Sequence, residues 1–402
     1  LYFTTGSSGE IWSQLWKTDG SVAGTASTGG STVQNSEGLA ALGDEVIFVK
    51  TSTVAPEIWR SDGTTAGTHL LAPMSAGGFS GEIFTLTSSG GLVYVRRASY
   101  FDSVIELWRT DGTAAGTFRV ASASGRTPYY MPALSAAGRS SAAFWVEGES
   151  NFQLWGSNGT PSGSGLLYTT ADKNIVAENN VSSPDALYFL LGSSTFKLWK
   201  TDGTPGGTGE VLMDNPGSWG ASRKLMLAGP NLYFPLVTAA YGRELFAIAT
   251  SALKTQGDIY RDAYATWSST AGLSGEAASP TAVPRNDGVA NLLKYAFFLD
   301  GTSADNRTLT PGSGVSGLPA ISIGNGSNDG NVLRIEFIRR MGGGLTYTPK
   351  ISATLTAGSF VAMTAQTTTV TPVDTLRERV VIESQLDPTA PAAFAVVEVS
   401  GL

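Results

Sequence analysis

The feature that most constrains this chain is a segment that recurs every 43 to 49 residues through the first 250 residues. Each copy places an aromatic residue directly after an aliphatic one. Five of the six copies continue, after two further residues, into Asp-Gly-Thr or a close variant. Self-similarity at this period indicates an array of supersecondary units, each burying its apolar face against the next. The aromatic anchors are Trp16, Trp59, Trp108, Trp155, Trp199 and Phe246, and the turn residues after them are Asp19, Asp62, Asp111, Asn158 and Asp202.

Each unit is predicted to contain four short strands. An apolar, aromatic-rich stretch precedes every anchor, as at 46–49, 92–95 and 187–190, and a weaker apolar stretch comes before several of them. β-Branched and aromatic residues bounded by Gly-containing turns favour strands over helices. Four strands in about 45 residues match the size of a propeller blade. We therefore expect a mainly all-β protein whose residues 1–252 form a six-bladed β-propeller.

The Asp-Gly-Thr segment has the chemistry of a turn. Glycine adopts a positive φ without steric cost, and an Asp side chain accepts hydrogen bonds from backbone N–H groups two or three residues further on. The Trp supplies apolar surface between blades, and its indole N–H is expected to find a carbonyl. We therefore predict that the anchors and turn residues maintain the fold. Calcium binding at these turns is the alternative, although the turns lack the acid spacing of a calcium loop.

These residues resemble a bacterial repeat family named for its Glu-Leu-Trp-x-x-Asp-Gly-Thr signature. The resemblance covers roughly residues 1–250, and it implies an exported, multi-repeat propeller protein without an established enzymatic activity. The chain departs from the signature at Asn158, at Ser164 in place of the closing Thr, and after Phe246, where the turn is missing.

The two ends of the array are expected to be incomplete. The first unit lacks its leading strand and the last unit lacks its trailing strand. Either residues upstream of Leu1 have been lost, or the ring closes by an unusual pairing, or a neighbouring molecule supplies a strand to the unpaired edge. The chain does not begin with Met, so we interpret it as a processed or truncated product.

After residue 252 the pattern changes. A helix is predicted at 258–270 with a stop at Gly272, and an Asn286-Asp287-Gly288 segment leads into a second helix. That segment resembles one found before the C-terminus of exported bacterial proteins, where an Asp-Gly-rich, calcium-binding type of loop precedes Asn-Leu-Leu-Glu-Tyr-Ala. Two side chains are too few for calcium, so helix capping by Asn286 or Asp287 is the favoured interpretation. We predict a helical and loop linker at 253–312 and a β-sandwich at 313–402.

Composition excludes several kinds of site and partner. The chain has no Cys and one His, His69, so thiol catalysis, disulfides and a His-rich zinc site are excluded. A net charge of −7 argues against nucleic acid as a partner. No apolar run reaches the length of about 20 residues that spans a bilayer. We expect no cofactor and no membrane-spanning segment.

Three functions are weighed. The first is a non-catalytic, secreted or cell-surface structural or adhesion protein that self-assembles into an extracellular polymer or binds other envelope and matrix components. The second is a carbohydrate-binding, lectin-like propeller that uses loop aromatics on a polysaccharide. The third is a glycosidase, which needs a unique pair of carboxylates, and the repeats contain no such pair. We favour the first, and we expect no enzyme. The loop aromatics considered for the second are Tyr100, Phe101, Tyr129 and Tyr130.

Overall fold

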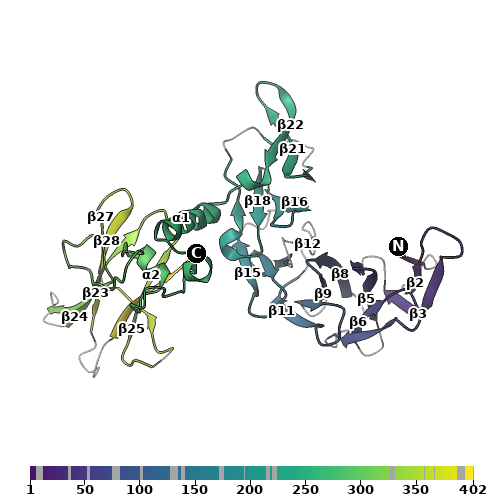
Figure 1. The fold of residues 1–402 in the computed structure, drawn as a ribbon, viewed down its shortest axis with the longest axis horizontal. Helices are drawn as coiled ribbons and strands as arrows, with labels where there is room; N and C mark the ends of the chain where they lie inside the picture. Colours follow the sequence, from purple (N-terminus) through teal and green to yellow (C-terminus); the bar gives the residue numbers. More distant parts are fainter. Residues whose placement is uncertain are drawn as a thin grey trace. The chain divides into compact units, whose positions relative to one another are not determined.

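The chain divides into two units, Leu1–Thr255 and Gln256–Leu402, which we call unit 1 and unit 2 and describe separately (Figure 1). The computed structural model is dominated by β-strands. It describes residues 1–5, 12–34, 38–51, 55–74, 82–99, 103–126, 135–136, 141–171, 176–193, 195–213, 218–219, 224–325, 331–356, 358–365, 367–386 and 394–401.

Unit 1 contains six antiparallel sheets, numbered here in chain order, and each is a simple up-and-down meander. In the described residues, sheets 1 and 6 have three strands and the others have four. Sheet 1 consists of β1 (Tyr2–Thr5), β2 (Trp12–Lys17) and β3 (Ala26–Gln34). Sheet 2 consists of β4 (Leu39–Leu42), β5 (Glu45–Thr51), β6 (Pro56–Ser61) and β7 (His69–Pro73). Sheet 3 consists of β8 (Glu82–Ser89), β9 (Leu92–Ser99), β10 (Val104–Thr110) and β11 (Phe118–Ser124). Sheet 4 consists of β12 (Ser135–Ala136), β13 (Ala142–Glu147), β14 (Phe152–Ser157) and β15 (Ser164–Thr170). Sheet 5 consists of β16 (Val176–Ser182), β17 (Leu187–Gly192), β18 (Phe196–Thr201) and β19 (Gly209–Glu210). Sheet 6 consists of β20 (Met226–Ala228), β21 (Asn231–Thr238) and β22 (Gly242–Ala249).

The six aromatic anchors occupy equivalent places, one in each sheet. Each anchor lies on the strand that leads into the Asp-Gly-Thr turn, or into the chain segment that follows sheet 6. On the preceding strand, a residue of the apolar stretch lies opposite the anchor. In five sheets this opposing residue is Phe, and the two ring centroids lie 6.2 to 6.4 Å apart. The cross-strand pairs are Phe3 with Trp16, Phe48 with Trp59, Val95 with Trp108, Phe144 with Trp155, Phe189 with Trp199 and Phe234 with Phe246.

Successive sheets are joined by apolar cores. Because side chains alternate along a strand, the aliphatic residue before each anchor points away from the anchor's face. Leu198 of sheet 5 packs with Leu232 and Phe234 of sheet 6, and Leu154 of sheet 4 packs in the same way on sheet 5. The aliphatic residues that fill these interfaces are at most 1% exposed: Leu15, Ile58, Leu107, Leu154 and Leu198.

The outer face of sheet 6 differs from the equivalent faces of the other sheets. Leu245 is the counterpart of the five buried aliphatic residues, yet it is 69% exposed. Met226, on the neighbouring part of the sheet, is 57% exposed. No following sheet covers this face in the described part of the chain, so the closed six-bladed ring stays a prediction.

The chain leaves unit 1 by turning back onto sheet 5. A short 3-10 turn, η2 (Thr250–Ala252), follows β22, and Leu253 is fully buried in the core between sheets 5 and 6. Thr255 then forms an antiparallel bridge with Val211, and the N–H of Leu212 donates to the carbonyl of Lys254 at 2.9 Å. We call residues 250–255 the exit segment. It follows β22 at the position where the other sheets have the Asp-Gly-Thr turn, which sheet 6 lacks.

Unit 2 combines two helices with two antiparallel sheets around a shared core. The first helix, α1 (Gln256–Thr270), begins two residues before the predicted start and ends before Gly272, whose φ is +71°. The second, α2 (Asn291–Ala296), has six residues, or about 1.7 turns. The sheets have the strand orders β23 (Ala320–Asn325), β24 (Asn331–Arg340), β28 (Arg377–Gln385), β27 (Thr367–Pro372) and β26 (Val361–Ala362), β25 (Thr346–Ser352), β29 (Phe394–Ser400).

Much of the segment predicted as a linker belongs to the core of unit 2. Val289 and Phe297 are buried with Phe337 of β24 and Val380 of β28, and Tyr347 of β25 packs against the same cluster. Residues 256–312 thus contribute apolar surface to both sheets.

Candidate functional site

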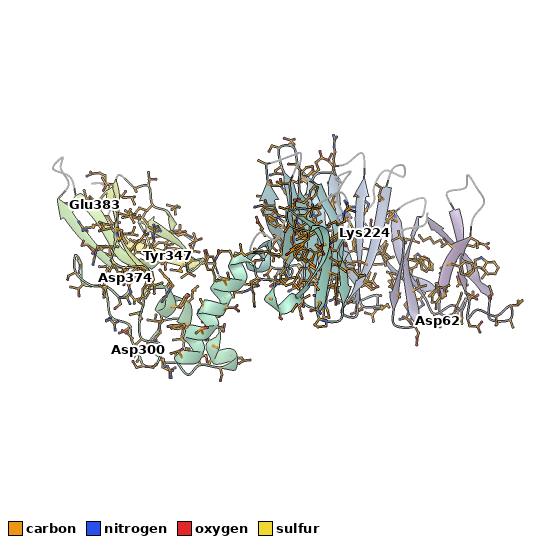
Figure 2. All side chains as sticks on the ribbon, turned by 90° about the horizontal axis from the view of Figure 1, so that it is seen from above. Asp62, Lys224, Asp300, Tyr347, Asp374 and Glu383 are labelled. Atoms are coloured by element: carbon orange, nitrogen blue, oxygen red, sulfur yellow. The ribbon has the colours of Figure 1, made fainter. Side chains whose placement is uncertain are left out.

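The Asp-Gly-Thr turns are the most regular polar structures in unit 1. In sheet 2, Asp62 Oδ1 accepts the backbone N–H of Thr64 at 2.8 Å and its hydroxyl at 2.7 Å. Figure 2 shows Asp62 at the surface of the unit. The hydroxyl of Thr64 also accepts the N–H of Gly67 at 2.9 Å. One carboxylate oxygen and one hydroxyl thus organise the whole loop, and we call the equivalent loops the motif turns (residues 18–25, 61–68, 110–117, 157–164 and 201–208).

A second pair of hydroxyls closes each motif turn. Ser61 Oγ lies 2.7 Å from Thr68 Oγ1 and accepts the N–H of Gly63 at 3.0 Å. Thr68 donates its hydroxyl to the carbonyl of Thr64 at 2.6 Å. The same hydroxyl pair spans 2.6 to 2.7 Å in the other four turns. The residue before the Asp is therefore part of the motif, a role that the sequence analysis missed.

Each motif turn needs two glycines for different reasons. Gly63 has a φ of +91°, which side chains rarely adopt. Gly67 has no such conformation, but a Cβ there would lie 2.1 Å from the carboxylate of Asp62. The first glycine therefore provides the bend, and the second makes room for the acid.

The drifted fourth turn keeps this geometry without a charge. Asn158 Oδ1 accepts the N–H and hydroxyl of Thr160 at 3.1 and 2.8 Å, and Ser164 replaces the closing Thr with a 2.6 Å contact to Ser157. In the acidic turns, the hydrogen bonds from the hydroxyl and backbone of Thr64 lower the pKa of Asp62. What the turn requires is an oxygen acceptor, which both Asp and Asn supply.

The indole N–H groups bind a side chain within the motif. Trp59 Nε1 donates to Glu57 Oε2 at 2.9 Å, and Trp155 Nε1 donates to Gln153 Oε1 at 2.8 Å. Residues two apart on a strand share a face, so a Glu or Gln at this position lies within reach of the indole in sheets 2, 3 and 4. In sheet 5 the position holds Lys197, whose ammonium cannot accept. The acceptor is thus a carboxylate in place of the expected carbonyl in sheets 2 and 3, and the amide carbonyl of Gln153 in sheet 4. In sheet 1, the N–H of Trp16 is buried without an acceptor among the described atoms.

A basic residue directly after the Trp links consecutive sheets. Lys17 Nζ donates to the carbonyl of Asp62 at 2.6 Å, and Arg60 Nη1 donates to the carbonyl of Gly112 at 2.9 Å. We call these contacts cation tethers, because each runs from one sheet to the motif turn of the next. Lys200 makes the last one, to the carbonyl of Leu253 in the exit segment, at 3.4 Å. Four of the five Trp motifs carry Lys or Arg at this position, a signal that the sequence analysis left unused.

In unit 2, Asp287 is paired with a lysine. Its Oδ2 lies 2.5 Å from Nζ of Lys294, whose side chain is fully buried. The same ammonium donates to the carbonyls of Asp300 and Ser303 at 3.1 and 2.8 Å. Burial raises the pKa of Asp287, but the bonds from Lys294 and from backbone N–H groups outweigh it and lower that pKa to about 2. A cation supplied by the chain therefore faces this carboxylate.

The expected capping role is wrong for both residues of the Asn-Asp pair. The residue that caps α2 is Ala290, and no side chain bonds to the helix end there. Asn286 instead has a φ of +53°, so it provides a left-handed bend. Asp287 instead accepts the N–H groups of Val289 and Asp305 and forms a charge-assisted contact with the ammonium of Lys294.

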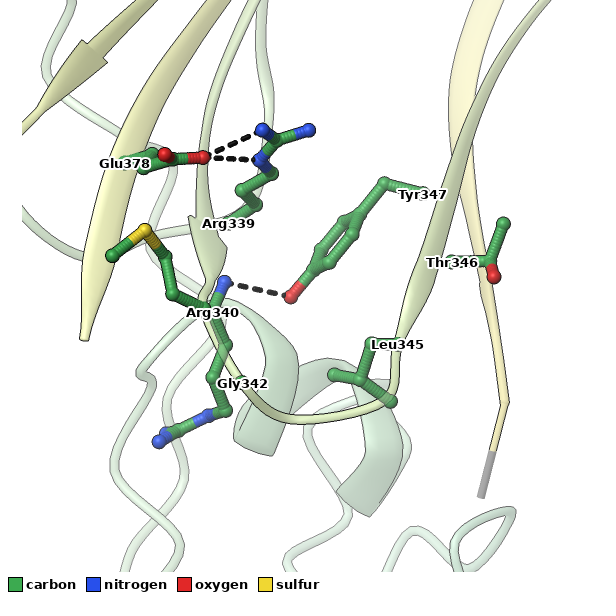
Figure 3. Close-up of a pocket in the computed structure, with 8 residues that line it drawn as sticks. Arg339, Arg340, Gly342, Leu345, Thr346, Tyr347 and Glu378 are labelled. Atoms are coloured by element: carbon green, nitrogen blue, oxygen red, sulfur yellow. Dashed lines mark hydrogen bonds and ion pairs between the residues drawn. The ribbon is translucent and has the colours of Figure 1, made fainter. Parts of the chain in front are cut away.

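A pocket of about 500 Å³ lies in unit 2, and Figure 3 shows its polar groups. Its one carboxylate, Glu378, lies 2.6 Å from Nη2 of Arg339. Tyr347 accepts the backbone N–H of Arg340 at 2.9 Å, and burial raises its pKa to about 12. A glycosidase requires two carboxylates across a bond. This pocket offers a single ion-paired one and does not favour that chemistry.

Other predicted features are placed as follows. His69 is exposed at the start of β7, opposite Arg60. The loop aromatics considered for carbohydrate lie outside the described residues. Within the part of the chain that the structure describes, no three acidic, His or Cys side chains gather into a metal-binding group, and no helix is long and apolar enough to cross a membrane.

The claim that the second glycine of a motif turn makes room for the acid can be tested at Gly116. A Cβ added at Gly116 would lie 2.0 Å from Asp111 Oδ2. We expect Gly116→Ala to destabilise unit 1 by about 1–3 kcal/mol, because the clash breaks the turn's hydrogen bonds. In an Asp111→Ala background, Gly116→Ala should destabilise unit 1 by about half as much or less. Urea unfolding followed by Trp fluorescence measures both. Gly165→Ala, with open space around its Cβ, is the control. Fully additive costs would contradict the steric explanation.

No family model and no curated protein matches the chain. Solved structures that resemble it include prolyl endopeptidases, with 12% identity, a TM-score of 0.34, and coverage of 84% of this chain and 44% of that one. An oligogalacturonate lyase from Vibrio parahaemolyticus has 12% identity, a TM-score of 0.35, and coverage of 60% and 70%. The β-propeller domain of the Trilobed protease from Pyrococcus furiosus has 14% identity, a TM-score of 0.33, and coverage of 61% and 74%. The chain spans less than half the length of the endopeptidase, and likenesses this weak carry no functional argument. The assignment of function rests on the motif turns and the interfaces that they border.

Proposed function

We propose that this chain is a non-catalytic structural or adhesion protein of the bacterial exterior. Its first 250 residues would form a six-bladed propeller of the Glu-Leu-Trp-x-x-Asp-Gly-Thr type, and its C-terminal part a β-sandwich. Its partners would be further copies of itself or other components of the envelope or extracellular matrix. Secretion or surface display follows from the resemblance to exported repeat proteins.

The observation that carries this proposal is that the recurring acids are used to build turns. Asp62 and Asp111 each bind the hydroxyl and N–H two residues further on, and Asn158 does the same work uncharged. An acid that an amide replaces without loss of geometry serves architecture better than proton transfer, for which the amide is useless. The repeated acids therefore support a structural role.

The experiment is an isosteric scan on surface-displayed protein. Asp19, Asp62, Asp111 and Asp202 are changed to Asn one at a time, and displaying cells are compared for attachment to polysaccharide-coated beads and to one another. We expect display of the unchanged chain to raise attachment. We expect each Asn variant to keep both its fold and that attachment, since Asn158 already supports a turn.

Two results would count against the proposal. One is that display confers no attachment to any surface or cell. The other is that the purified chain turns over chromogenic glycosides and that a folded Asp→Asn or Glu→Gln variant abolishes this turnover. Alanine variants of the same acids provide the matched control, because their loss of attachment should follow their loss of folded protein.

A further inference from the structure

One interface between sheets of unit 1 lacks a cation tether. In sheet 4 the residue after the Trp is Gly156, where the other motifs have Lys or Arg. A pocket of about 280 Å³ opens at this place, between the motif turns of sheets 4 and 5. Its lining includes Gly156, Gly165 and residues from both turns: Asn158, Gly163, Asp202 and Gly203.

The preceding interface shows what fills the equivalent space. Arg109 Nε donates to the carbonyl of Gly116 at 3.1 Å, and Nη2 lies 3.3 Å from Asp111 Oδ2. Nη1 reaches the carbonyl of Gly159, in the next motif turn, at 3.5 Å. The guanidinium also stacks on the ring of Phe118, 4.8 Å from its centroid. A single guanidinium thus binds three oxygens and one aromatic face.

The pocket contains the counterparts of these groups without the cation. Gly163, Asn158 and Gly203 correspond by motif position to Gly116, Asp111 and Gly159. The carbonyl of Gly163 accepts the backbone N–H of Asn158 at 3.1 Å, and its second lone pair remains for a further donor. The strand partners correspond as well, because Arg109 lies opposite Phe118 in sheet 3 and Gly156 lies opposite Gly165 in sheet 4.

Two glycines therefore replace the two side chains that fill the preceding interface, and Leu167 takes part of the space beside Gly156, since a Cβ there would lie 2.6 Å from Leu167 Cδ1. The oxygen-bearing positions remain, and the carboxylate of Asp202 lines the pocket as an additional acid. The lining favours a cation over an anion, since it includes the carboxylate of Asp202 and no Lys or Arg. A planar donor with several N–H groups matches three acceptors in a fixed arrangement better than a compact ammonium does.

We propose that this pocket binds the guanidinium of an arginine side chain presented by another polypeptide. The bound side chain would occupy the place that Arg109 occupies one interface earlier. It would donate to the carbonyls of Gly163 and Gly203 and to the amide oxygen of Asn158. This inference concerns a ligand site and holds for the purified chain whether or not it mediates attachment.

The test uses the full chain and a pentapeptide, Gly-Gly-Arg-Gly-Gly, followed by ligand-observed NMR titration. The matched control peptide carries citrulline, which has the same shape and no charge. We expect saturable binding of the arginine peptide and binding of the citrulline peptide that is about tenfold weaker or more. Equal binding of the two peptides would overturn the proposal. Tighter binding of free arginine than of the peptide would overturn the assignment to a polypeptide.

Two variants change the affinity in opposite directions. Asn158→Asp restores the acid of the motif and should tighten arginine-peptide binding about fivefold, because a charge-assisted bond replaces a neutral one. Gly156→Arg, combined with Leu167→Ala to make room for the new Cβ, places the chain's own guanidinium in the pocket and should abolish binding. Circular dichroism checks that each variant is folded. Binding that neither variant alters would place the peptide elsewhere and refute the site.

Discussion

Replacing Lys294 with Ala is expected to lower the free energy of unfolding of unit 2 by about 3–5 kcal/mol, one of the largest effects of any single change in this chain. The ammonium is fully buried and binds Asp287 together with the carbonyls of Asp300 and Ser303. Its removal leaves a buried carboxylate and two carbonyls without their cation. Amide hydrogen exchange of the full chain, followed at increasing urea concentration in peptides from unit 2, measures the loss.

The control is Lys350→Ala, which removes an ion pair with the largely exposed Glu398. A surface pair of this kind contributes about 1 kcal/mol or less. The pH dependence is a second readout. Since the folded pKa of Asp287 is about 2, below the unfolded value of about 3.9, its contribution is complete above about pH 5 and is lost as the pH falls through about 2. Equal losses for the two lysine variants would show that the buried pair contributes no more than the exposed one.

Leu154→Ala is expected to destabilise unit 1 by about 2–5 kcal/mol, because it opens a cavity in the core between sheets 4 and 5. Leu154 is 1% exposed and packs on Leu187 and Phe189. Its counterpart Leu245 occupies the same motif position but is 69% exposed, so Leu245→Ala should change stability by about 0.5 kcal/mol or less. Urea midpoints of the two variants, measured side by side, make the comparison. A similar cost for both would mean that the outer face of sheet 6 is covered in solution.

The strands of unit 1 were predictable because several independent patterns agree there. Periodic aromatic anchors, apolar stretches and Gly-containing turns all indicate the same meander, and the registers place every anchor equivalently. The hydrogen bonds of the motif turn were predictable in part, since Asx and hydroxyl contacts lie within a few residues of each other.

The contacts between sheets were not predictable in the same way. A basic residue after the Trp is visible in the sequence, but its partner lies about 50 residues further on, in another sheet. The Asp287 and Lys294 pair was missed because the two residues were weighed only against the local helix. One signal was present: the segment that this region resembles carries Glu at the position of Lys294, and exchanging an acid for a cation there changes what the neighbouring acid can bind.

Each interface between consecutive sheets is filled by its own buried aliphatic residue, and this has an evolutionary consequence. Stability in such an array is close to a sum of terms between neighbours, so a change at one interface leaves the rest intact. Gly156 and Gly165 remove two large side chains from one interface, while the cores on either side keep their buried leucines. A repeat array can therefore acquire a specialised contact at one interface while the remaining interfaces keep the fold stable.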